Sequence, residues 1–113
     1  MTLTNDQAVQ YFHQLRTVPP CTGKLGWAIY RNLKTLSNAL EEYNKMHDEL
    51  VKKYSSDGRT VDSDKIPAFS KELEPLLNLS QDIAIYEIDE KDLYSDNLTA
   101  QDYMKIDFML KQA

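Results

Sequence analysis

The chain has 113 residues, of which 42% are hydrophobic, and its formal net charge is −5 at pH 7. This size and composition predict one domain over residues 1–113 with a small core. The sequence contains no apolar run long enough for a transmembrane helix and no signal-peptide pattern at its start. A single cysteine cannot form an internal disulfide, so we expect a reducing, cytoplasmic setting.

The acidic surplus lies in the last third of the sequence. Residues 1–81 contain ten acidic and ten basic residues, whereas residues 82–113 contain eight acidic and three basic ones. Phosphate binding needs clustered cations, so we expect no nucleic-acid partner for this part of the chain. The acidic residues either keep the chain soluble or form a surface for a basic protein partner. The candidates for that partner interface are Glu87, Glu90 and Asp92.

A first helix is predicted over about residues 5–17, with Thr4 or Asn5 as its N-cap. It is too short to be stable alone, so we expect it to pack on a longer helix. The Pro19-Pro20 pair ends it, because proline fixes its own φ and restricts the residue before it.

The longest predicted element is one amphipathic helix over about residues 24–54. Its apolar residues recur at alternating spacings of four and three, which is the heptad pattern of helix-on-helix packing. This seam consists of Ile29, Leu33, Leu36, Leu40, Tyr43, His47, Leu50 and Tyr54. Thr22 is the expected cap of the helix. Trp27, near its start, is either a core anchor or an exposed contact residue.

Thirty helical residues span about 45 Å, so the long helix is expected to project beyond a compact body. The apolar seam residues of a projecting helix are expected to pack against another element. Either the first and last helices of the same chain pack on it, or a second copy of the chain does. The seam residues predicted as interface candidates are Leu36, Leu40, Tyr43, His47 and Leu50.

Residues 55–65 are polar and contain an Asp57-Gly58 turn signal, so they are expected to end the long helix. The acidic residues Asp62 and Asp64 do not complete a calcium loop, because the glycine and the final glutamate of an EF-hand are missing at the required offsets. The next helix is predicted to begin at Ile66-Pro67, with the proline in its first turn.

The clearest predicted strand spans residues 82–89, where apolar side chains occupy both faces. A lone strand cannot pair its own backbone groups, so its expected partner is either residues 59–61 or another chain. A last helix is predicted after Thr99, its N-cap. The predicted fold is mainly α, of the α+β class: three to four helices organised around one long helix, plus a small two-stranded β element.

No motif for catalysis, metal binding or nucleotide binding stands out. The acid pairs Glu41/Glu42 and Asp48/Glu49 fall on predicted solvated faces, where no pocket shifts their pKa values. His47, with Glu42, Tyr43 or Asp48 nearby, either belongs to a site or is a seam histidine hydrogen-bonded to a carboxylate across the helix pair, and we favour the second interpretation. We therefore predict a protein that is not an enzyme, with no cofactor and no metal.

The order of these elements resembles a known family. Residues 24–34 have the form K-x-x-x-A-I-x-x-N-L-K, and they are followed by the Phe69–Leu77 helix, the Ile83–Ile88 strand and the Leu98-Thr99 helix start. Over about residues 24–110 this order resembles a family of small proteins of unknown function from tailed phages and prophages of Gram-positive bacteria. The resemblance implies a bacterial cytoplasm as location and supplies no activity and no catalytic residues.

We therefore expect a non-enzymatic phage or prophage accessory protein that acts by protein–protein interaction. In one version its acidic C-terminal part binds and modulates a host protein, such as a nucleic-acid enzyme or a defence factor. The alternative is an assembly or virion-associated protein whose long helix pairs with copies of itself, as a homodimer, or with a phage structural protein. Neither version involves a membrane or a nucleic acid as direct partner.

Overall fold

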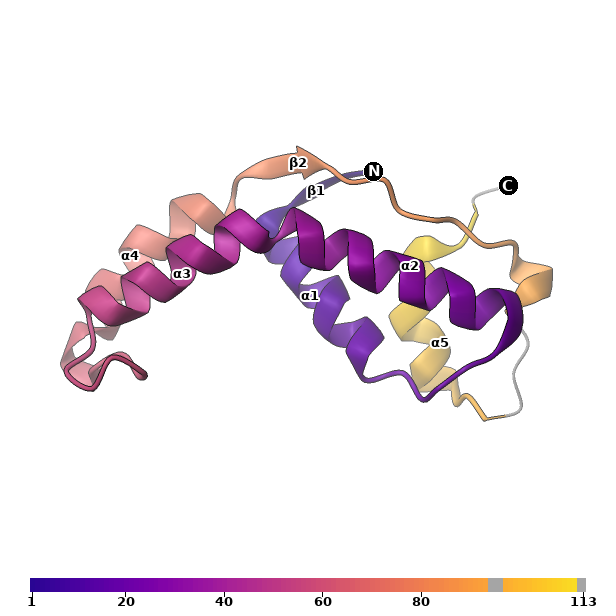
Figure 1. The fold of residues 1–113 in the computed structure, drawn as a ribbon, viewed down its shortest axis with the longest axis horizontal. Coiled ribbons are helices and arrows are strands. Elements are labelled where there is room, and N and C mark those ends of the chain that lie inside the picture. Colours follow the sequence, from indigo (N-terminus) through magenta and orange to yellow (C-terminus); the bar gives the residue numbers. More distant parts are fainter. Residues whose placement is uncertain (94–96, 112–113) are drawn as a thin grey trace.

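The computed structural model describes residues 1–93 and 97–111. The body is elongated, about 49 × 27 × 19 Å along its principal axes. One group of helices forms a lobe, and an antiparallel pair forms an arm that extends from it (Figure 1). The lobe contains α1 (Asn5–Arg16), α2 (Gly23–Ala39) and α5 (Ala100–Ile106), and the arm contains α3 (Glu41–Lys53) and α4 (Ile66–Leu77). The mainly helical class with a small two-stranded sheet is confirmed.

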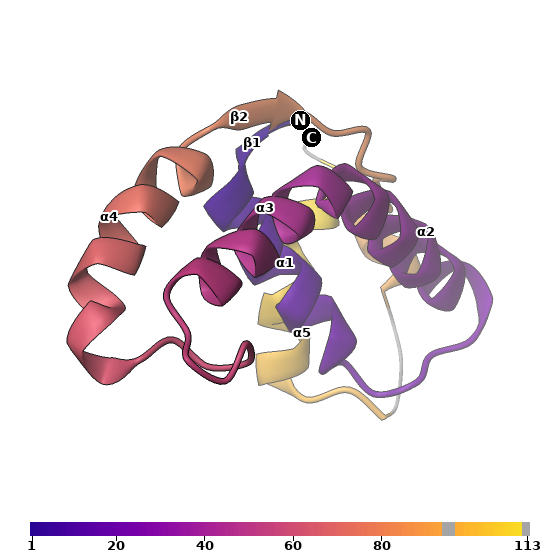
Figure 2. The ribbon, with the colours of Figure 1, turned by 60° about the vertical axis from the view of Figure 1, so that its left-hand side comes forward.

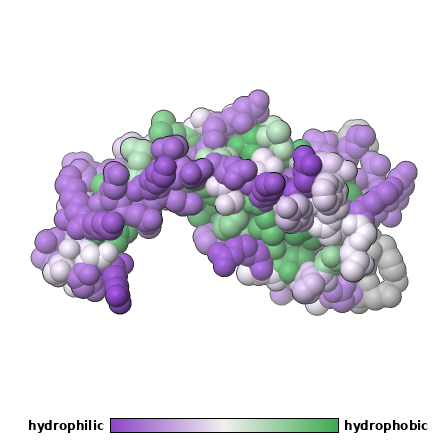
Figure 3. Space-filling model, in the orientation of Figure 1, coloured by the Kyte–Doolittle hydropathy of each residue, from purple (hydrophilic) through white to green (hydrophobic). Residues whose placement is uncertain are grey.

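The core lies among α1, α2 and α5, and Figure 2 shows the arrangement of these helices from a second side. Its largest fully buried apolar side chains are Leu15, Leu36, Ile106 and Met109. Apolar atoms reach the surface below α2, whereas hydrophilic atoms cover the near side of α3 (Figure 3). The apolar interior therefore belongs mainly to the lobe, and the arm contributes little to it.

The first helix begins as predicted. The Thr4 hydroxyl accepts a hydrogen bond from the Gln7 N–H (3.1 Å), and the Gln7 side chain accepts one from the Thr4 N–H (3.0 Å). This reciprocal pair is a capping box, which satisfies two backbone donors at the helix start. The Tyr11 ring stacks on Phe108 with 4.1 Å between ring centroids, so the first helix is fixed to the C-terminal segment.

The prediction of one continuous helix over residues 24–54 is wrong. The chain bends at Leu40, which separates α2 from α3, although its backbone still makes helical hydrogen bonds on both sides. At the bend the Gln81 side-chain amide donates to the Ala39 carbonyl (3.0 Å). Helices kink where a side chain enters the ladder of backbone hydrogen bonds. A residue far along the chain therefore satisfies a carbonyl at the bend, and the heptad pattern contains no sign of this contact.

The predicted two-stranded element exists, but both strands lie elsewhere. Strand β1 (Thr2–Thr4) pairs antiparallel with β2 (Ser80–Asp82). Residues 59–61 form no strand and lie in the loop between α3 and α4. Residues 83–88 run along α2 without forming a strand. The Ile83 N–H donates to the Met1 carbonyl (2.8 Å), and an isolated bridge joins Ile88 to Leu110. The predicted strand over residues 82–89 is therefore wrong in its place and its partner.

At Tyr86 a single buried side chain takes the place of a strand partner. Asn32 of α2 is completely buried. Its Nδ2 donates to the Tyr86 carbonyl (2.9 Å), and its Oδ1 accepts from the Tyr86 N–H (2.7 Å). The side-chain amide thus satisfies both backbone groups of Tyr86, as a neighbouring strand would.

Of the caps predicted for α5 and α2, one forms the expected hydrogen bonds and the other does not. The Thr99 hydroxyl accepts from the Asp102 N–H, and the Asp102 carboxylate accepts from the Thr99 N–H, so the predicted cap of α5 is confirmed. Thr22 precedes α2, but its side chain makes no capping hydrogen bond.

Trp27 is 51% exposed and lies against Tyr30, with ring centroids 5.9 Å apart. Of the two roles considered for it, the structure excludes that of a core anchor.

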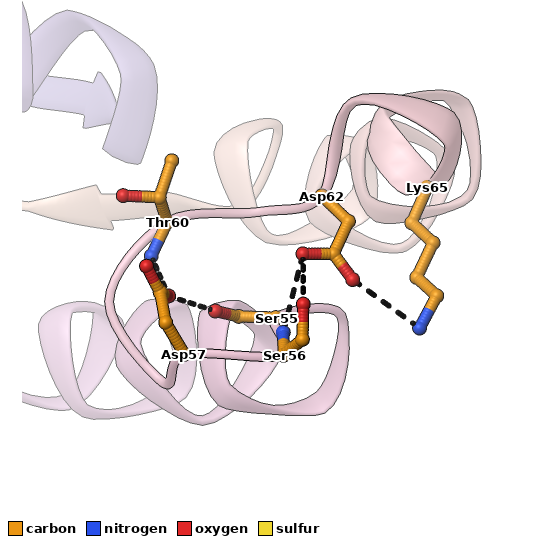
Figure 4. A network of polar contacts seen from close by, with 6 residues as sticks. All are labelled: Ser55, Ser56, Asp57, Thr60, Asp62 and Lys65. Atoms are coloured by element: carbon orange, nitrogen blue, oxygen red, sulfur yellow. Dashed lines mark hydrogen bonds and ion pairs between the residues drawn. The ribbon is translucent and has the colours of Figure 1, made fainter.

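Two carboxylates hold the loop between α3 and α4 (Figure 4). Asp57 Oδ1 accepts from the Ser55 hydroxyl (2.6 Å) and from the backbone N–H groups of Arg59 (2.8 Å) and Thr60 (2.9 Å). These hydrogen bonds, that of Ser55 first, favour the charged form and lower the pKa of Asp57 from 3.8 to about 2.

Asp62 holds the other side of the same loop. Its Oδ1 accepts from the Ser56 hydroxyl (2.7 Å) and N–H (3.2 Å), and its Oδ2 lies 3.5 Å from Lys65 Nζ. The hydrogen bonds from Ser56 are the main reason why the pKa of Asp62 is lowered. Both carboxylates therefore accept hydrogen bonds from groups of the loop itself.

Titration by NMR is expected to give Asp57 a pKa of about 2. Because this value lies below the ordinary 3.8, the stabilisation that Asp57 provides is complete above 3.8 and is lost as the pH falls through about 2. Ser55→Ala removes the largest cause and should raise the pKa toward the ordinary value. Ser70→Ala, on the exposed side of α4, should leave it unchanged. An ordinary pKa in the unsubstituted protein would contradict this loop geometry.

Candidate functional site

The five seam candidates divide between the core and the arm. Leu36 and Leu40 have exposed fractions of 0% and 2%, and Tyr43 has 9%. The chain itself therefore covers these three side chains, and they offer no surface to a partner in this fold. His47 and Leu50 are half-buried on α3. The His47 ring lies 5.9 Å from that of Phe69 in α4, so the second half of the seam packs within the arm.

The three acidic candidates have different surroundings. Glu87 and Glu90 are exposed. Asp92 is half-buried, and its Oδ1 lies 3.7 Å from Lys24 Nζ at the start of α2. Asp92 therefore interacts with the chain's own lysine, whereas Glu87 and Glu90 remain on the surface.

Glu90 lines a hollow of about 500 Å³ at the C-terminal side of the lobe. The hollow lies between the short 3-10 helix Glu90–Asp92 and α5 with the turn that follows it. Its lining residues are Glu90, Leu93, Tyr103, Met104, Asp107 and Leu110. Two carboxylates and no cation are among them. Met104 is 76% exposed, more than any other large hydrophobic residue in the described chain. We call this feature the acidic hollow.

The local sequence explains how α5 presents the hollow. Ile106 and Met109 are completely buried, and they fix one side of the C-terminal segment in the core. Met104 and Asp107 are three residues apart, a spacing that places neighbours on one helical face. Backbone hydrogen bonds join the Ile88 N–H to the Met109 carbonyl and the Lys111 N–H to the Ile88 carbonyl. These bonds hold the segment before Glu90 against the C-terminal turn.

Sequence reasoning identified Glu90 but missed Met104 and Asp107. A signal for both was present. Met104 lies beside the apolar stripe of the last helix rather than on it, and Asp107 follows on the same side. An apolar residue outside the stripe, next to an acid, is a sign of an exposed apolar patch.

The most reactive side-chain type in the chain is placed unfavourably for nucleophilic chemistry. Cys21 Sγ donates a hydrogen bond to the Pro19 carbonyl (3.2 Å). Burial, and then the charge of Asp102, raises the pKa of the Cys21 thiol. A raised pKa keeps the thiol protonated and makes it a weak nucleophile.

No protein-family model, curated protein or solved structure matches this chain. Residues 1–93 and 97–111 contain no group of three or more His, Cys, Asp or Glu side chains arranged to hold a metal. In the same residues no helix combines the length and hydropathy needed to cross a membrane. Function must therefore be inferred from the surface of the protein.

Proposed function

We propose that this chain is a non-enzymatic accessory protein of the phage or prophage type, which binds a basic segment of another protein in the acidic hollow. The observation that carries the proposal is the combination of two apolar lining residues, the exposed Met104 and the half-buried Leu93, with the carboxylates of Glu90 and Asp107.

Lysine and arginine fit such a surface because their side chains have two parts. The aliphatic stem covers apolar atoms, and the cationic end meets a carboxylate. Methionine adapts its shape to different partners, so Met104 suits a contact of this kind. A host protein whose basic surface normally holds nucleic acid offers many such side chains. The acidic hollow would compete for that surface by charge complementarity.

The double variant Glu90→Lys/Asp107→Lys is expected to weaken binding of a basic peptide by at least about tenfold, because like charges then face each other. The probe is a fluorescent peptide of alternating lysine and leucine, measured by anisotropy at low and high salt. Glu41→Lys/Glu74→Lys changes the net charge equally on the arm and should bind as the unsubstituted protein does. Equal losses in both double variants would reduce the effect to overall charge and contradict a specific hollow.

The same variants separate the two kinds of partner in a cell extract. Capture from a phage-bearing Gram-positive bacterium should recover one host protein, in a salt-sensitive manner. That protein should be lost with Glu90→Lys/Asp107→Lys and kept with the arm variant. Recovery of phage structural proteins alone, unaffected by either variant, would contradict the proposal and favour an assembly role.

A further inference from the structure

The arm has apolar side chains that the rest of the chain does not cover. None of the twelve residues of α4 is buried, and Tyr43 is the one buried residue of α3. A helix in a protein gains most of its stability from packing its apolar face, and stable domains pack elements in layers around a core. Two helices side by side form one layer, so the arm lacks the second.

A groove of about 790 Å³ lies between the two helices of the arm. Its apolar lining includes Met46 and Leu50 from α3 and Pro75 and Leu76 from α4. Met46 is 46% exposed. This groove is the place where a second layer of helices would bury the uncovered side chains.

The charges beside the groove balance each other. Glu49 and Lys53 on α3 and Lys71 and Glu72 on α4 line it. Lys53 Nζ lies 2.9 Å from Glu72 Oε1, so these two form an ion pair within the chain. In the part of the chain that the structure describes, neither Glu49 nor Lys71 has an ion-pair partner. Among the charged residues that line the groove, each helix therefore contributes one without an ion pair, and the two are opposite in sign.

We propose that the arm of a second copy occupies this groove, giving a two-fold symmetric four-helix bundle. With the two-fold axis parallel to the helices, α3 of one copy lies over α4 of the other. Glu49 of each copy then meets Lys71 of the other, as an isologous interface requires. A strongly acidic or strongly basic partner would leave one of the two charges facing its own sign, which disfavours it.

The dimer changes which seam residues contact another chain. Leu50 takes part together with Met46 outside the seam, whereas Leu36 and Leu40 stay in the core of each copy. The dimer also presents two acidic hollows on one particle. If both engage one partner, the second contact becomes intramolecular, and overall affinity rises without any new contact.

The test is the mass of the protein in solution, measured by light scattering and sedimentation over a wide concentration range. The unsubstituted chain is expected to approach twice the chain mass as the concentration rises. Glu49→Lys alone, or Lys71→Glu alone, should weaken the dimer by at least about tenfold, because each places like charges together twice. An equimolar mixture of the two variants should restore the dimer, because every contact in the mixed pair is again between opposite charges.

The control is Lys52→Glu, an exposed residue of α3 that does not line the groove. It should dimerise as the unsubstituted chain does. Circular dichroism should show the same helix content in all variants. A mass of one chain at every concentration would overturn the proposal and leave the groove to a helix of a different protein. Single variants that remain dimeric, or a mixture that stays monomeric, would overturn it as well.

Discussion

Asn32→Ala is expected to lower the free energy of unfolding by about 2–4 kcal/mol. The substitution removes two hydrogen bonds, of 2.9 and 2.7 Å, to the backbone of Tyr86. It leaves the carbonyl and the N–H of Tyr86 without the partner that the fold supplies. It also empties space in the core, since the Asn32 side chain is completely buried. These two hydrogen bonds are partly buried, and a donor or acceptor left without a partner away from water costs more than an average hydrogen bond contributes.

Urea unfolding monitored by circular dichroism measures this change. The matched control is Asn38→Ala, because Asn38 is an exposed asparagine of the same helix, and its effect should stay within about 0.5 kcal/mol. Asn32→Leu separates packing from hydrogen bonding, since it fills the space but pairs neither backbone group. Near-complete recovery of stability by leucine would show that the hydrogen bonds to Tyr86 contribute little.

The same asparagine shows where sequence reasoning reached its limit. Residues 83–88 have the apolar composition of a strand, but they form no strand in the structure. Among them, the backbone groups of Tyr86 bond to a side chain 54 positions away, and that pairing leaves no trace in a local pattern. The true strands, Thr2–Thr4 and Ser80–Asp82, are three residues long and mostly polar. They lack the alternation by which strands are recognised.

Signals between residues three or four positions apart were more informative. Thr99 was predicted as a cap, and Thr4 was one of two candidates for the first cap, because the residues that mark a helix start lie within a few positions of it. The amphipathic pattern also located the helical segments on both sides of Leu40. At the bend itself a carbonyl accepts from Gln81, which the heptad pattern does not include. Local chemistry thus indicates where helices begin, whereas contacts from distant side chains exist only in the folded structure.

The candidate site shows the same contrast between what local sequence signals indicate and what only the folded structure decides. Charge counting pointed to the last third of the chain and to Glu90, which lines the acidic hollow. It could not separate Glu90 from Asp92, because the ion pair with Lys24 exists only after folding. The seam pattern could not separate Leu36 from Leu50 either. The first is in the core of the lobe and the second is in the arm.

Gly26→Ala is expected to destabilise the protein by about 2–3 kcal/mol, although alanine is the better helix former. A Cβ at position 26 would collide with the Cys21 carbonyl oxygen and would lie 2.8 Å from the carbonyl carbon. Both atoms belong to backbone directly after the Pro19-Pro20 pair, where the chain has little freedom to move aside. Alanine at an unobstructed helical position would instead stabilise by about 1 kcal/mol.

The control for this effect is Gly58→Ala in the loop after α3. Gly58 has a φ of +75°, and an added Cβ would meet nothing within 4 Å. Its substitution should cost about 1–2 kcal/mol, from backbone conformation alone. Thermal and urea unfolding should therefore rank Gly26→Ala as the more destabilising change, despite its helical position. The reverse order would mean that the Cys21 backbone yields. The connection between α1 and α2 would then be less rigid than its close contact implies.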